Sequence, residues 1–390
     1  MAKILWYGDA VSHTGFARVT HSILEYLSKD HEVVVFGINY NGDPHEYPFR
    51  IYPAGGENPG DRFGLGRLPL VVEKEAPDFV IALNDIWMIN QVWEKIHFLQ
   101  PVHKFKFIPY FPIDSERYVG SMLRYVKDWD FSITFTIEQA QRIQNHNVQP
   151  KQLGVLPHGI DVDKFSPMDM LEARKRLSIP QDKFIVLNAN RNQPRKRIDL
   201  TIQAFAEFAK DKPDTMLYLH MGEKDLGWSV REVFDSEMSR RGLDPTNRLI
   251  MTMSHINYMN PPTDETLNLI YNACDVGINT ADGEGWGLVP FEHAACRRPQ
   301  VIPNHTSCKD IWKNKGCLID VAAWVRDKDL SVERGIIDVD SAVEHLNKLY
   351  EDKKYREEVA EECYQCTQNP AYRWEEIANG FKKAMEDLSK

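Results

Sequence analysis

The sequence has little of several features that would by themselves indicate a function. Its 390 residues include only six cysteines, too few for a disulfide scaffold, and no apolar run approaches the roughly 18 residues of a membrane span. Positive charge is also in deficit, since 47 Lys and Arg face 57 Asp and Glu, which gives a net charge of −10. This balance argues against a protein that coats nucleic acid or anionic lipid over its whole surface, although a local basic site remains compatible with it.

The start of the chain and its cysteines give an expectation for the compartment. The first apolar run, residues 4–7, stops at Gly8 and Asp9 and is shorter than the apolar core of a signal peptide, so it is interpreted as a buried strand. Cys363 and Cys366 form a C-x-x-C pair, but in a charged, helix-like stretch without the turn of a zinc site. We therefore expect free thiols, no bound metal and a cytoplasmic protein.

The order of apolar and amphipathic segments predicts the fold class. A chain of 390 residues is longer than a single core usually reaches, which favours two domains. Runs that are continuously apolar are typical of parallel strands covered by helices on both faces. The sequence therefore predicts an α/β protein with two doubly wound domains and a ligand in the cleft between them. The expected strands form two series: residues 4–7, 33–36, 79–83, 105–110 and 131–135, then 184–187, 216–219, 248–251, 276–279 and 300–302.

Turn-forming residues mark the expected change from one domain to the other. The segment L-P-H-G-I-D-V-D-K-F-S-P, residues 156–167, has turn formers at both ends. We expect an N-terminal domain of residues 1–165, completed by 372–390, and a C-terminal domain of residues 166–371. After about Asp320 the strand signals fade, and the pattern predicts helices at residues 341–350, 354–368 and 373–388.

A glycine-rich segment after the strand at 276–279 is the strongest candidate for a ligand site. It reads D-G-E-G-W-G-L-V-P-F-E over residues 282–292, and a helix is expected to begin near Leu288. Its three glycines allow the backbone to approach a ligand closely, and free amides at a helix start suit a phosphate. Glu292, in the first turns of this helix, suits a ribose diol better than a phosphate. The alternative is an ordinary glycine-rich loop whose glutamate is favoured by the helix dipole.

A cluster of cations follows the expected strand at 184–187. The segment N-R-N-Q-P-R-K-R, residues 190–197, contains four of them: Arg191, Arg195, Lys196 and Arg197. Arginine offers a planar fork to phosphate oxygens, and lysine offers a mobile point charge. The alternative is a solvated basic turn, but the position at the end of a buried strand favours a phosphate site.

A third candidate is the turn S-H-T-G-F-A at residues 12–17, between the first strand and the first helix. Gly15 lets the backbone approach a ligand there, and the helix start again presents amides. The turn does not have the G-x-G-x-x-G spacing of a dinucleotide site, so an NAD-dependent oxidoreductase is only a runner-up by fold.

Together these segments resemble the large family-4 group of retaining glycosyltransferases, which have the GT-B fold. The resemblance is carried by the E-x7-E pattern of Glu284 and Glu292, by Arg191 with Lys196, and by the P-H-G-I-D-V-D-K-F-S-P linker. The segment Y-N-A-C-D-V before the glutamates and the C-terminal R-W-E-E-I-A are similar to the family as well. The resemblance implies two Rossmann-like domains facing a central cleft, with a last helix that crosses back onto the N-terminal domain.

The resemblance also implies a role for each matching position. Arg191 and Lys196 would neutralise the diphosphate of a nucleotide-sugar donor, while Glu292 would bind its ribose. Glu284 would contact the donor sugar and would count with the two cations as catalytic. The other donor-binding positions, which would surround the diphosphate and the base, are Gly15, Ile256, Gly285, Gly287 and Leu288.

The sequence departs from the family at several places. Arg197 and Arg297 stand where many members have glycine, and the first loop has one clear glycine, Gly15, where many have two. The histidine of the family's H-D pair is not found. Asp85 and Asp114 lie at the corresponding strand ends, where each is expected either to orient an acceptor hydroxyl or to form an ordinary helix cap or turn.

The implied function is retaining, metal-independent transfer of a sugar from a nucleotide-diphosphate sugar to a hydroxyl acceptor. No cofactor and no D-x-D metal signature are expected. The alternatives are a sugar-nucleotide epimerase or hydrolase of the same fold, and a non-catalytic nucleotide-sugar binding protein. The expected partners are the donor and an acceptor that is a glycan, a lipid or another hydroxyl compound, without bulk nucleic-acid binding.

The segment at residues 117–127 mixes basic and aromatic residues, and weak peripheral membrane contact is one expectation for it. The spacing of Tyr118, Met122 and Tyr125 fits better with an amphipathic helix that packs on the sheet.

Overall fold

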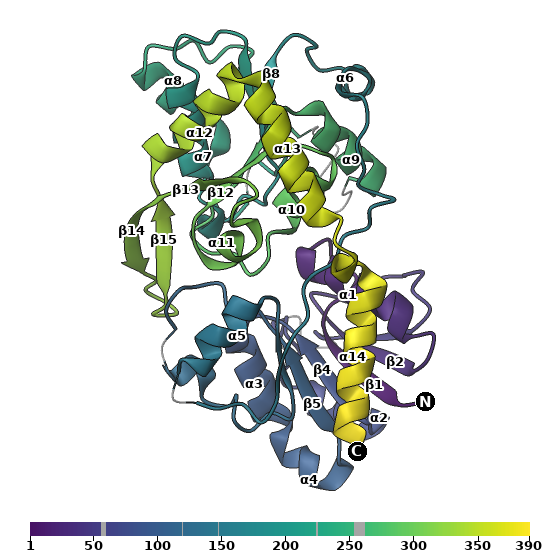
Figure 1. Ribbon diagram of the computed structural model, residues 1–390. Coiled ribbons are helices and arrows are strands. Elements are labelled where there is room, and N and C mark those ends of the chain that lie inside the picture. Colours follow the sequence, from purple (N-terminus) through teal and green to yellow (C-terminus); the bar gives the residue numbers. More distant parts are fainter. Residues whose placement is uncertain (56–59, 119, 147, 224, 253–261) are drawn as a thin grey trace. The chain divides into compact units, whose positions relative to one another are not determined.

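All ten expected strands form, and they are divided between two parallel sheets (Figure 1). The computed structural model describes residues 1–390 except 56–59, 119, 147, 224 and 253–261. The described chain forms two compact units. Unit 1 comprises Met1–Ile113, Tyr118–Gly159 and Pro370–Lys390, and unit 2 comprises Asp114–Arg117 and Ile160–Asn369.

The strands of unit 1 are all parallel, in the order β3-β2-β1-β4-β5-β6-β7. They are β1 (Lys3–Asp9), β2 (Glu32–Ile38), β3 (Arg50–Pro53), β4 (Phe79–Leu83), β5 (Lys106–Tyr110), β6 (Ser132–Thr134) and β7 (Leu153–Val155). The order reverses between β1 and β4, and in sheets of this kind ligands bind beside the carboxyl ends of the strands at the reversal. The sequence did not predict β3 and β7, which are short strands at the two edges of the sheet.

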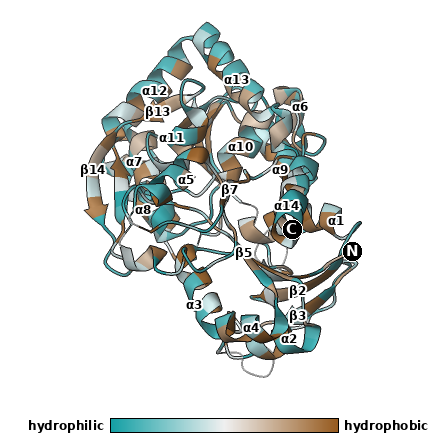
Figure 2. Ribbon diagram, turned by 60° about the horizontal axis from the view of Figure 1, so that its bottom comes forward, coloured by the Kyte–Doolittle hydropathy of each residue, from teal (hydrophilic) through white to brown (hydrophobic). Residues whose placement is uncertain are grey.

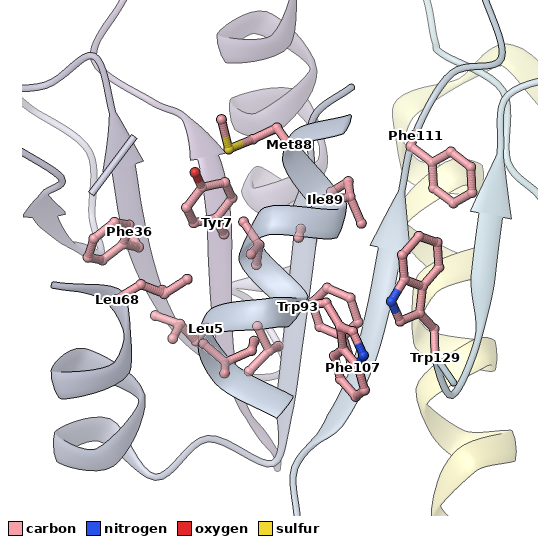
Figure 3. Packing of buried hydrophobic residues seen from close by; sticks show 14 of the residues in the cluster. Leu5, Tyr7, Phe36, Leu68, Met88, Ile89, Trp93, Phe107, Phe111 and Trp129 are labelled. Carbon is pink, nitrogen blue, oxygen red and sulfur yellow. The ribbon is translucent and has the colours of Figure 1, made fainter. Parts of the chain in front are cut away.

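Helices cover this sheet, and those that contain Leu68, Trp93 and Ile143 contribute side chains to one continuous hydrophobic core. They are α1 (Gly15–Leu27), α2 (Leu68–Glu75), α3 (Ile86–Ile96), α4 (Gln100–His103), α5 (Ile137–Gln144) and α14 (Trp374–Ser389). Figure 3 shows part of the core, where the rings of Tyr7 and Phe36 stack with centroids 5.8 Å apart. Trp93 of α3 lies against Phe107 of β5, with ring centroids 5.1 Å apart. These buried contacts fix the strand ends from which the unit 1 loops leave.

The C-terminal helix α14 belongs to unit 1, as the resemblance implied. It packs against α1, and Phe381 lies edge-on to Trp6 of β1 with ring centroids 5.8 Å apart. Gly159 makes room for the first residue of α14, because a Cβ at this position would lie 2.6 Å from the indole of Trp374.

The chain passes from unit 1 to unit 2 after Gly159 and returns after Asn369. The sequence predicts the first change at residue 165, near the far end of the turn-rich segment. Phe165 already packs on unit 2, where its ring lies 5.7 Å from that of Tyr271. The chain therefore enters unit 2 earlier than predicted, because Phe165 is buried in the core of unit 2 before the turn-rich segment ends.

The sheet of unit 2 has the same kind of order, β10-β9-β8-β11-β12-β13, and is also parallel. Its strands are β8 (Phe184–Asn188), β9 (Thr215–Leu219), β10 (Leu249–Met251), β11 (Val276–Ile278), β12 (Gln300–Pro303) and β13 (Cys317–Ile319). The order reverses between β8 and β11. The predicted α/β class with two doubly wound sheets is thus confirmed.

Helices surround the sheet of unit 2 as they do that of unit 1. They are α6 (Met170–Leu177), α7 (Ile198–Phe208), α8 (Val230–Arg240), α9 (Asp264–Ala273), α10 (Leu288–Ala295), α11 (Thr306–Trp312), α12 (Val339–Glu351) and α13 (Lys353–Thr367). Figure 2 shows hydrophobic residues on the strands and hydrophilic residues along helices such as α8 and α13. The helices expected at 341–350, 354–368 and 373–388 correspond to α12, α13 and α14.

The expectation that strands end near Asp320 is wrong. An antiparallel hairpin, β14 (Val321–Arg326) and β15 (Glu333–Ile337), follows β13 directly. Most residues of β14 are exposed, including Trp324 and Val325 at 47% and 43% of their full surface. A strand without a buried face has no apolar alternation, which is why the pattern did not reveal it.

Within the described part of the segment at 117–127, Gly120–Leu123 form a short 3₁₀ turn and no amphipathic helix is found. Tyr118, Met122 and Tyr125 nevertheless pack, partly buried, against the core of unit 1. Among the helices that the structure describes, each is too short or too polar to cross a bilayer.

All six cysteines are free and buried. Cys363 and Cys366 lie on α13, where the Cys363 thiol donates to the backbone oxygen of Lys315 at 2.9 Å. Within the described parts of the chain, no group of three or more His, Cys, Asp or Glu side chains is placed to hold a metal ion.

Candidate functional site

The two ligand-binding candidates of unit 2 begin at neighbouring strand ends. β8 and β11 pair in parallel, with Val186 opposite Val276 and Leu187 opposite Gly277. The cationic segment follows β8 and the glycine-rich segment follows β11, where the strand order of the sheet reverses. Segments that are far apart in the sequence therefore meet at the position where sheets of this kind bind ligands.

Side chains at the end of β8 shape the cationic segment. Asn188 accepts a hydrogen bond from the backbone amide of Asn190 at 3.0 Å and donates one to the hydroxyl of Thr201 at 2.8 Å. A 3₁₀ turn, Pro194–Lys196, follows and ends at Arg197, whose φ of +48° is left-handed. Beyond the buried strand, the turn places Arg195 and Lys196 on one carboxylate, that of Glu284, while Arg197 pairs with Asp199.

The glycine-rich segment depends on close backbone contacts and on one left-handed residue. A Cβ at Gly283 would lie 2.2 Å from the backbone oxygen of Asp114, so this position has no space for a side chain. Gly287 has a φ of +91° and is the N-cap of α10, which begins at Leu288 as predicted. Gly285 lies between these two positions. The loop is therefore compact, with the amide end of α10 directly behind it.

Glu284 is at the centre of a buried charge cluster. The ammonium of Lys196 donates to Oε1 at 2.5 Å, the amide of Asn279 donates to the same oxygen at 3.1 Å, and Nη1 of Arg195 lies 3.3 Å from Oε2. Burial by itself would raise the pKa of Glu284, but the charges of Lys196 and Arg195 outweigh it and lower the pKa to about 2. Two cations around one carboxylate leave a net positive charge, which suits an anionic ligand.

Glu292 is buried on α10, with 5% of its surface exposed. Its Oε2 accepts a hydrogen bond from the hydroxyl of Tyr271 at 2.8 Å. The Tyr271 ring stacks on His293, with centroids 5.4 Å apart, and burial lowers the pKa of His293 to about 3. This arrangement fixes the direction of the Glu292 carboxylate. Ile256, the predicted contact for a base, lies outside the described residues.

Arg191 has different surroundings from Lys196. Its Nε and Nη2 donate to the two carboxylate oxygens of Asp225 at 2.6 and 3.0 Å. The Arg191 side chain is 52% exposed, whereas that of Lys196 is 13% exposed. Arg191 and Lys196 therefore differ in burial and in partner, although the resemblance implies the same role for both.

Gly15 and Asp85 lie in unit 1, at the carboxyl ends of the strands where its order reverses. Gly15 is the first residue of α1, and the N-cap Thr14 donates to the carboxylate of Asp9 at 2.6 Å. Asp85 precedes α3, and its backbone amide donates to the side-chain oxygen of Asn84 at 2.9 Å.

Asp114, the second expected acceptor residue, belongs to unit 2. Nη1 of Arg334, on β15, donates to its carboxylate at 3.0 Å. No sequence motif includes Arg334, and Asp282 is predicted only as the first residue of the glycine-rich segment, without a role of its own. Burial raises the pKa of Asp282 to about 6, although Arg334 and Arg195 favour its charged form. Nothing in the local sequence marks Arg334, whereas Arg195 lies inside the cationic segment and could have been chosen from it.

A comparison with known proteins decides the family. Residues 169–365, about half of the chain, match the family described as glycosyl transferases group 1. The chain belongs to glycosyl transferases group 1. One relative, the D-inositol 3-phosphate glycosyltransferase of Geodermatophilus obscurus, is 30% identical over 179 residues, which are 45% of this chain and 38% of that protein. The protein of the same name from Mycobacterium sp. (strain JLS) is 26% identical over 215 residues, 54% of this chain and 46% of the relative. The matched region thus spans less than half the length of these relatives.

Solved structures share the fold of this group 1 member at low sequence identity. The sucrose-phosphate synthase of Thermosynechococcus elongatus has a TM-score of 0.75 at 16% identity, with 100% of this chain and 99% of that chain covered. Anabaena HepE in complex with UDP-glucose has a TM-score of 0.73 at 14% identity, with 99% of this chain and 100% of that chain covered. These likenesses show the GT-B fold with its two Rossmann-like domains.

Two arginines of this group 1 member replace glycines that the family resemblance led us to expect, and both have left-handed backbone. The φ angle is +48° at Arg197 and +56° at Arg297. A left-handed conformation costs a residue with a Cβ roughly 1–2 kcal/mol. Ion pairs hold both side chains, with Asp199 at 2.8 Å from Arg197 and Glu361 at 3.1 Å from Arg297. The turns therefore keep their backbone conformation although the residue has changed.

Proposed function

We propose that this protein is a retaining glycosyltransferase that moves a sugar from a nucleoside-diphosphate sugar to a hydroxyl acceptor without a metal ion. One observation carries the proposal. The charge cluster of Lys196, Arg195 and Glu284 joins the cationic segment to the loop that leads into α10, at the strand reversal of a glycosyl transferases group 1 chain. A net positive, largely buried cluster beside a helix start is suited to a diphosphate.

In this proposal the donor diphosphate binds between the cationic segment and the start of α10. Lys196 and Arg191 supply positive charge, and the backbone amides of Gly287 and Leu288 donate hydrogen bonds at the positive end of the helix dipole. Glu284 neutralises only one of the two cations that contact it, so positive charge remains for the phosphates. Each charged hydrogen bond of this kind contributes about 1.5–3 kcal/mol.

The two glutamates have separate roles in the proposal. Glu292, oriented by Tyr271 at 2.8 Å, accepts hydrogen bonds from the ribose diol of the donor. Glu284 and Gly285 line the region of the transferred sugar and the phosphate next to it. The family resemblance also implies Gly15 as a donor-binding position and Asp85 or Asp114 as acceptor-side positions.

The proposed chemistry concerns charge on the leaving group. As the bond from the sugar to the diphosphate breaks, negative charge grows on the β-phosphate. Lys196, Arg191 and the α10 amides stabilise this charge because they are already in position. The acceptor hydroxyl attacks from the side of the leaving group, and a phosphate oxygen takes its proton, so that the configuration at the anomeric carbon is retained. These residues stabilise the negative charge of the departing diphosphate, which in other enzymes a divalent cation does.

The fold neighbours support a nucleotide donor. Anabaena HepE was solved with UDP and glucose and with UDP-glucose. We extend to the present chain only the class that these ligands share, a nucleoside-diphosphate sugar, and name no particular base or sugar.

A thermal-shift screen tests the proposal. Nucleoside diphosphates and their sugars are added to the wild-type protein, and a ligand at 100 times its Kd is expected to add about 2.7 kcal/mol of stability. Product analysis with a labelled nucleotide sugar, with and without hydroxyl acceptors, then separates transfer from hydrolysis and epimerisation. A wild-type protein whose unfolding temperature no nucleotide raises would contradict the proposal.

The matched control for this screen is an exposed arginine away from the site. Arg176 on α6 is 43% exposed and pairs with Glu265 at 2.6 Å, much as the exposed Arg191 pairs with Asp225. Arg176→Ala should keep the full thermal shift of the wild-type protein, whereas Arg191→Ala should reduce it.

A further inference from the structure

We propose that Arg334 is a positioning residue, which holds Asp114 and Asp282 against Gly283 and so fixes the loop that carries Glu284. The inference rests on the proposed function, because that function gives Glu284 its role at the donor. Arg334 lies on the β14–β15 hairpin, and neither the cationic segment nor the glycine-rich segment includes it.

The side chain of Arg334 is buried among carboxylates. Its Nη1 donates to both the carboxylate and the backbone oxygen of Asp114, at 3.0 and 3.1 Å. Its Nε lies 3.8 Å from the carboxylate of Asp282, and only 8% of the Arg334 side chain is exposed. A buried guanidinium of this kind is stable only because anionic partners surround it.

The loop backbone is packed directly against this ion cluster. A Cβ at Gly283 would lie 2.2 Å from the Asp114 backbone oxygen and 2.6 Å from Nη1 of Arg334. The amide of Gly335, the next residue of β15, donates to the backbone oxygen of Asp282 at 3.0 Å. The hairpin therefore holds the loop through one side chain and one backbone hydrogen bond.

A second route leads from the same segment to Glu284 itself. The carboxylate of Glu116 accepts a hydrogen bond from the backbone amide of Thr306 at 2.8 Å. The hydroxyl of Thr306 in turn accepts one from the backbone amide of Glu284 at 3.2 Å. The backbone amide of Glu333 on β15 donates to the backbone oxygen of Arg117 at 3.2 Å, which attaches the segment Asp114–Arg117 to the hairpin.

Removal of the guanidinium has a consequence beyond the loss of one ion pair. Asp114 and Asp282 would remain as two neighbouring carboxylates, both largely buried, at 16% exposure of each side chain. Two carboxylates in such a site repel each other unless one of them is protonated. Because Gly283 lies in contact with this cluster, the loop is the element that would move, and Glu284 would move with it.

The test compares Arg334→Ala with two control variants of the full chain. Arg174→Ala removes another buried arginine of unit 2, one that pairs with Asp275 at 2.7 Å away from the loop, and so controls for general destabilisation. Arg326→Ala removes an exposed arginine of the same hairpin, which pairs with Glu333 at 3.1 Å. The measurements are hydrogen exchange by mass spectrometry, the unfolding temperature, and kcat and KM for donor turnover.

The expected result is local. Arg334→Ala should raise amide exchange across residues 282–288 about tenfold and lower kcat by about 10², the scale of a misplaced catalytic group, with a smaller change in KM. Arg174→Ala should lower the unfolding temperature at least as much without raising exchange in that loop, and Arg326→Ala should leave the loop unchanged. Adding Asp282→Asn to Arg334→Ala should restore part of the protection, because the repulsion between carboxylates is removed.

Unchanged exchange at residues 282–288 in Arg334→Ala, or an equal rise in Arg174→Ala, would overturn the inference. The exchange measurement needs no ligand, so it still decides the role of Arg334 if the wild-type protein turns over no nucleotide sugar. A wild-type protein that turns over no nucleotide sugar would count against the proposed function alone.

Discussion

Nζ of Lys196 lies 2.5 Å from Oε1 of Glu284, although 88 residues separate the two in the sequence. The contact joins the loop after β8 to the loop after β11. The cationic segment and the glycine-rich segment, which are far apart in the sequence, therefore form one charged group. Because Arg195 shares the same carboxylate, the group keeps a net positive charge. We expect a diphosphate to bind to this net positive charge.

Substitution of the two donor cations should separate catalysis from stability. Arg191→Ala and Lys196→Ala are each expected to lower turnover by about 10²–10³, the scale for the loss of one charge stabiliser. Lys196→Ala should also lower the unfolding free energy by about 2 kcal/mol or more, because Glu284 is buried and loses a partner. Arg191 is half exposed, so Arg191→Ala should change stability by less than about 0.5 kcal/mol. Steady-state kinetics and urea unfolding measure both effects, and near-normal transfer in either variant would contradict the assignment.

Glu292→Gln should weaken nucleotide binding by about tenfold or more, because a neutral amide replaces the carboxylate that we propose as the acceptor of ribose hydrogen bonds. Tyr271→Phe should have a smaller effect of the same sign, since it removes only the hydroxyl that orients Glu292 at 2.8 Å. Isothermal titration calorimetry with a nucleoside diphosphate gives both affinities. An unchanged Kd in Glu292→Gln would exclude the ribose role.

The pKa of Asp282 predicts a pH dependence of stability. Burial raises this pKa from 3.8 to about 6, while Arg334, Arg195 and Arg197 oppose the shift and Asp114 adds to it. The protonated carboxyl of Asp282 contributes its full stabilisation below about pH 3.8, and this contribution is lost as the pH rises through 6. Relative to Asp282→Asn, the wild-type protein should lose about 2 kcal/mol of unfolding free energy between pH 4.5 and pH 7.5. Urea unfolding of both proteins at the two pH values checks this, and a difference that does not change with pH would refute it.

Arg297 offers a test of backbone strain. Its φ of +56° favours glycine, so Arg297→Gly should be more stable than Arg297→Ala by about 1 kcal/mol. Both variants lose the ion pair with Glu361, and the comparison therefore isolates the backbone. At Glu358, an exposed position inside α13, the order should reverse, with glycine about 1 kcal/mol less stable than alanine. Thermal unfolding of the four variants measures both differences, and the same order at both positions would contradict this explanation.

The sequence was sufficient to predict the strands that are formed by buried apolar runs. Each of the ten expected strands lies inside a sheet, and the start of α10 at Leu288 follows from the left-handed Gly287 before it. The strands that were not predicted are edge strands of three or four residues or belong to the exposed hairpin. Strands this short or this exposed contain too few alternating buried positions for a periodic pattern to mark them.

Side-chain partners in the site could not be predicted in the same way. The cationic segment marked Arg191 and Lys196, but the sequence does not say that the first pairs with Asp225 and the second with Glu284. These choices depend on the turn after β8 and on burial, which only the fold determines. Arg334 is the clearest case, because Asp114 and Asp282 come from two distant segments and its own hairpin has no local signal.

Calorimetric titration with a nucleoside and with its diphosphate decides whether Lys196 and the charge cluster around it bind the donor diphosphate, as we propose. The wild-type protein should bind the diphosphate about 10²-fold or more tightly than the nucleoside, and Lys196→Ala should remove most of that difference, with little effect on the nucleoside itself. A wild-type protein that binds both equally, or a Lys196→Ala variant that keeps the full difference, would contradict the account.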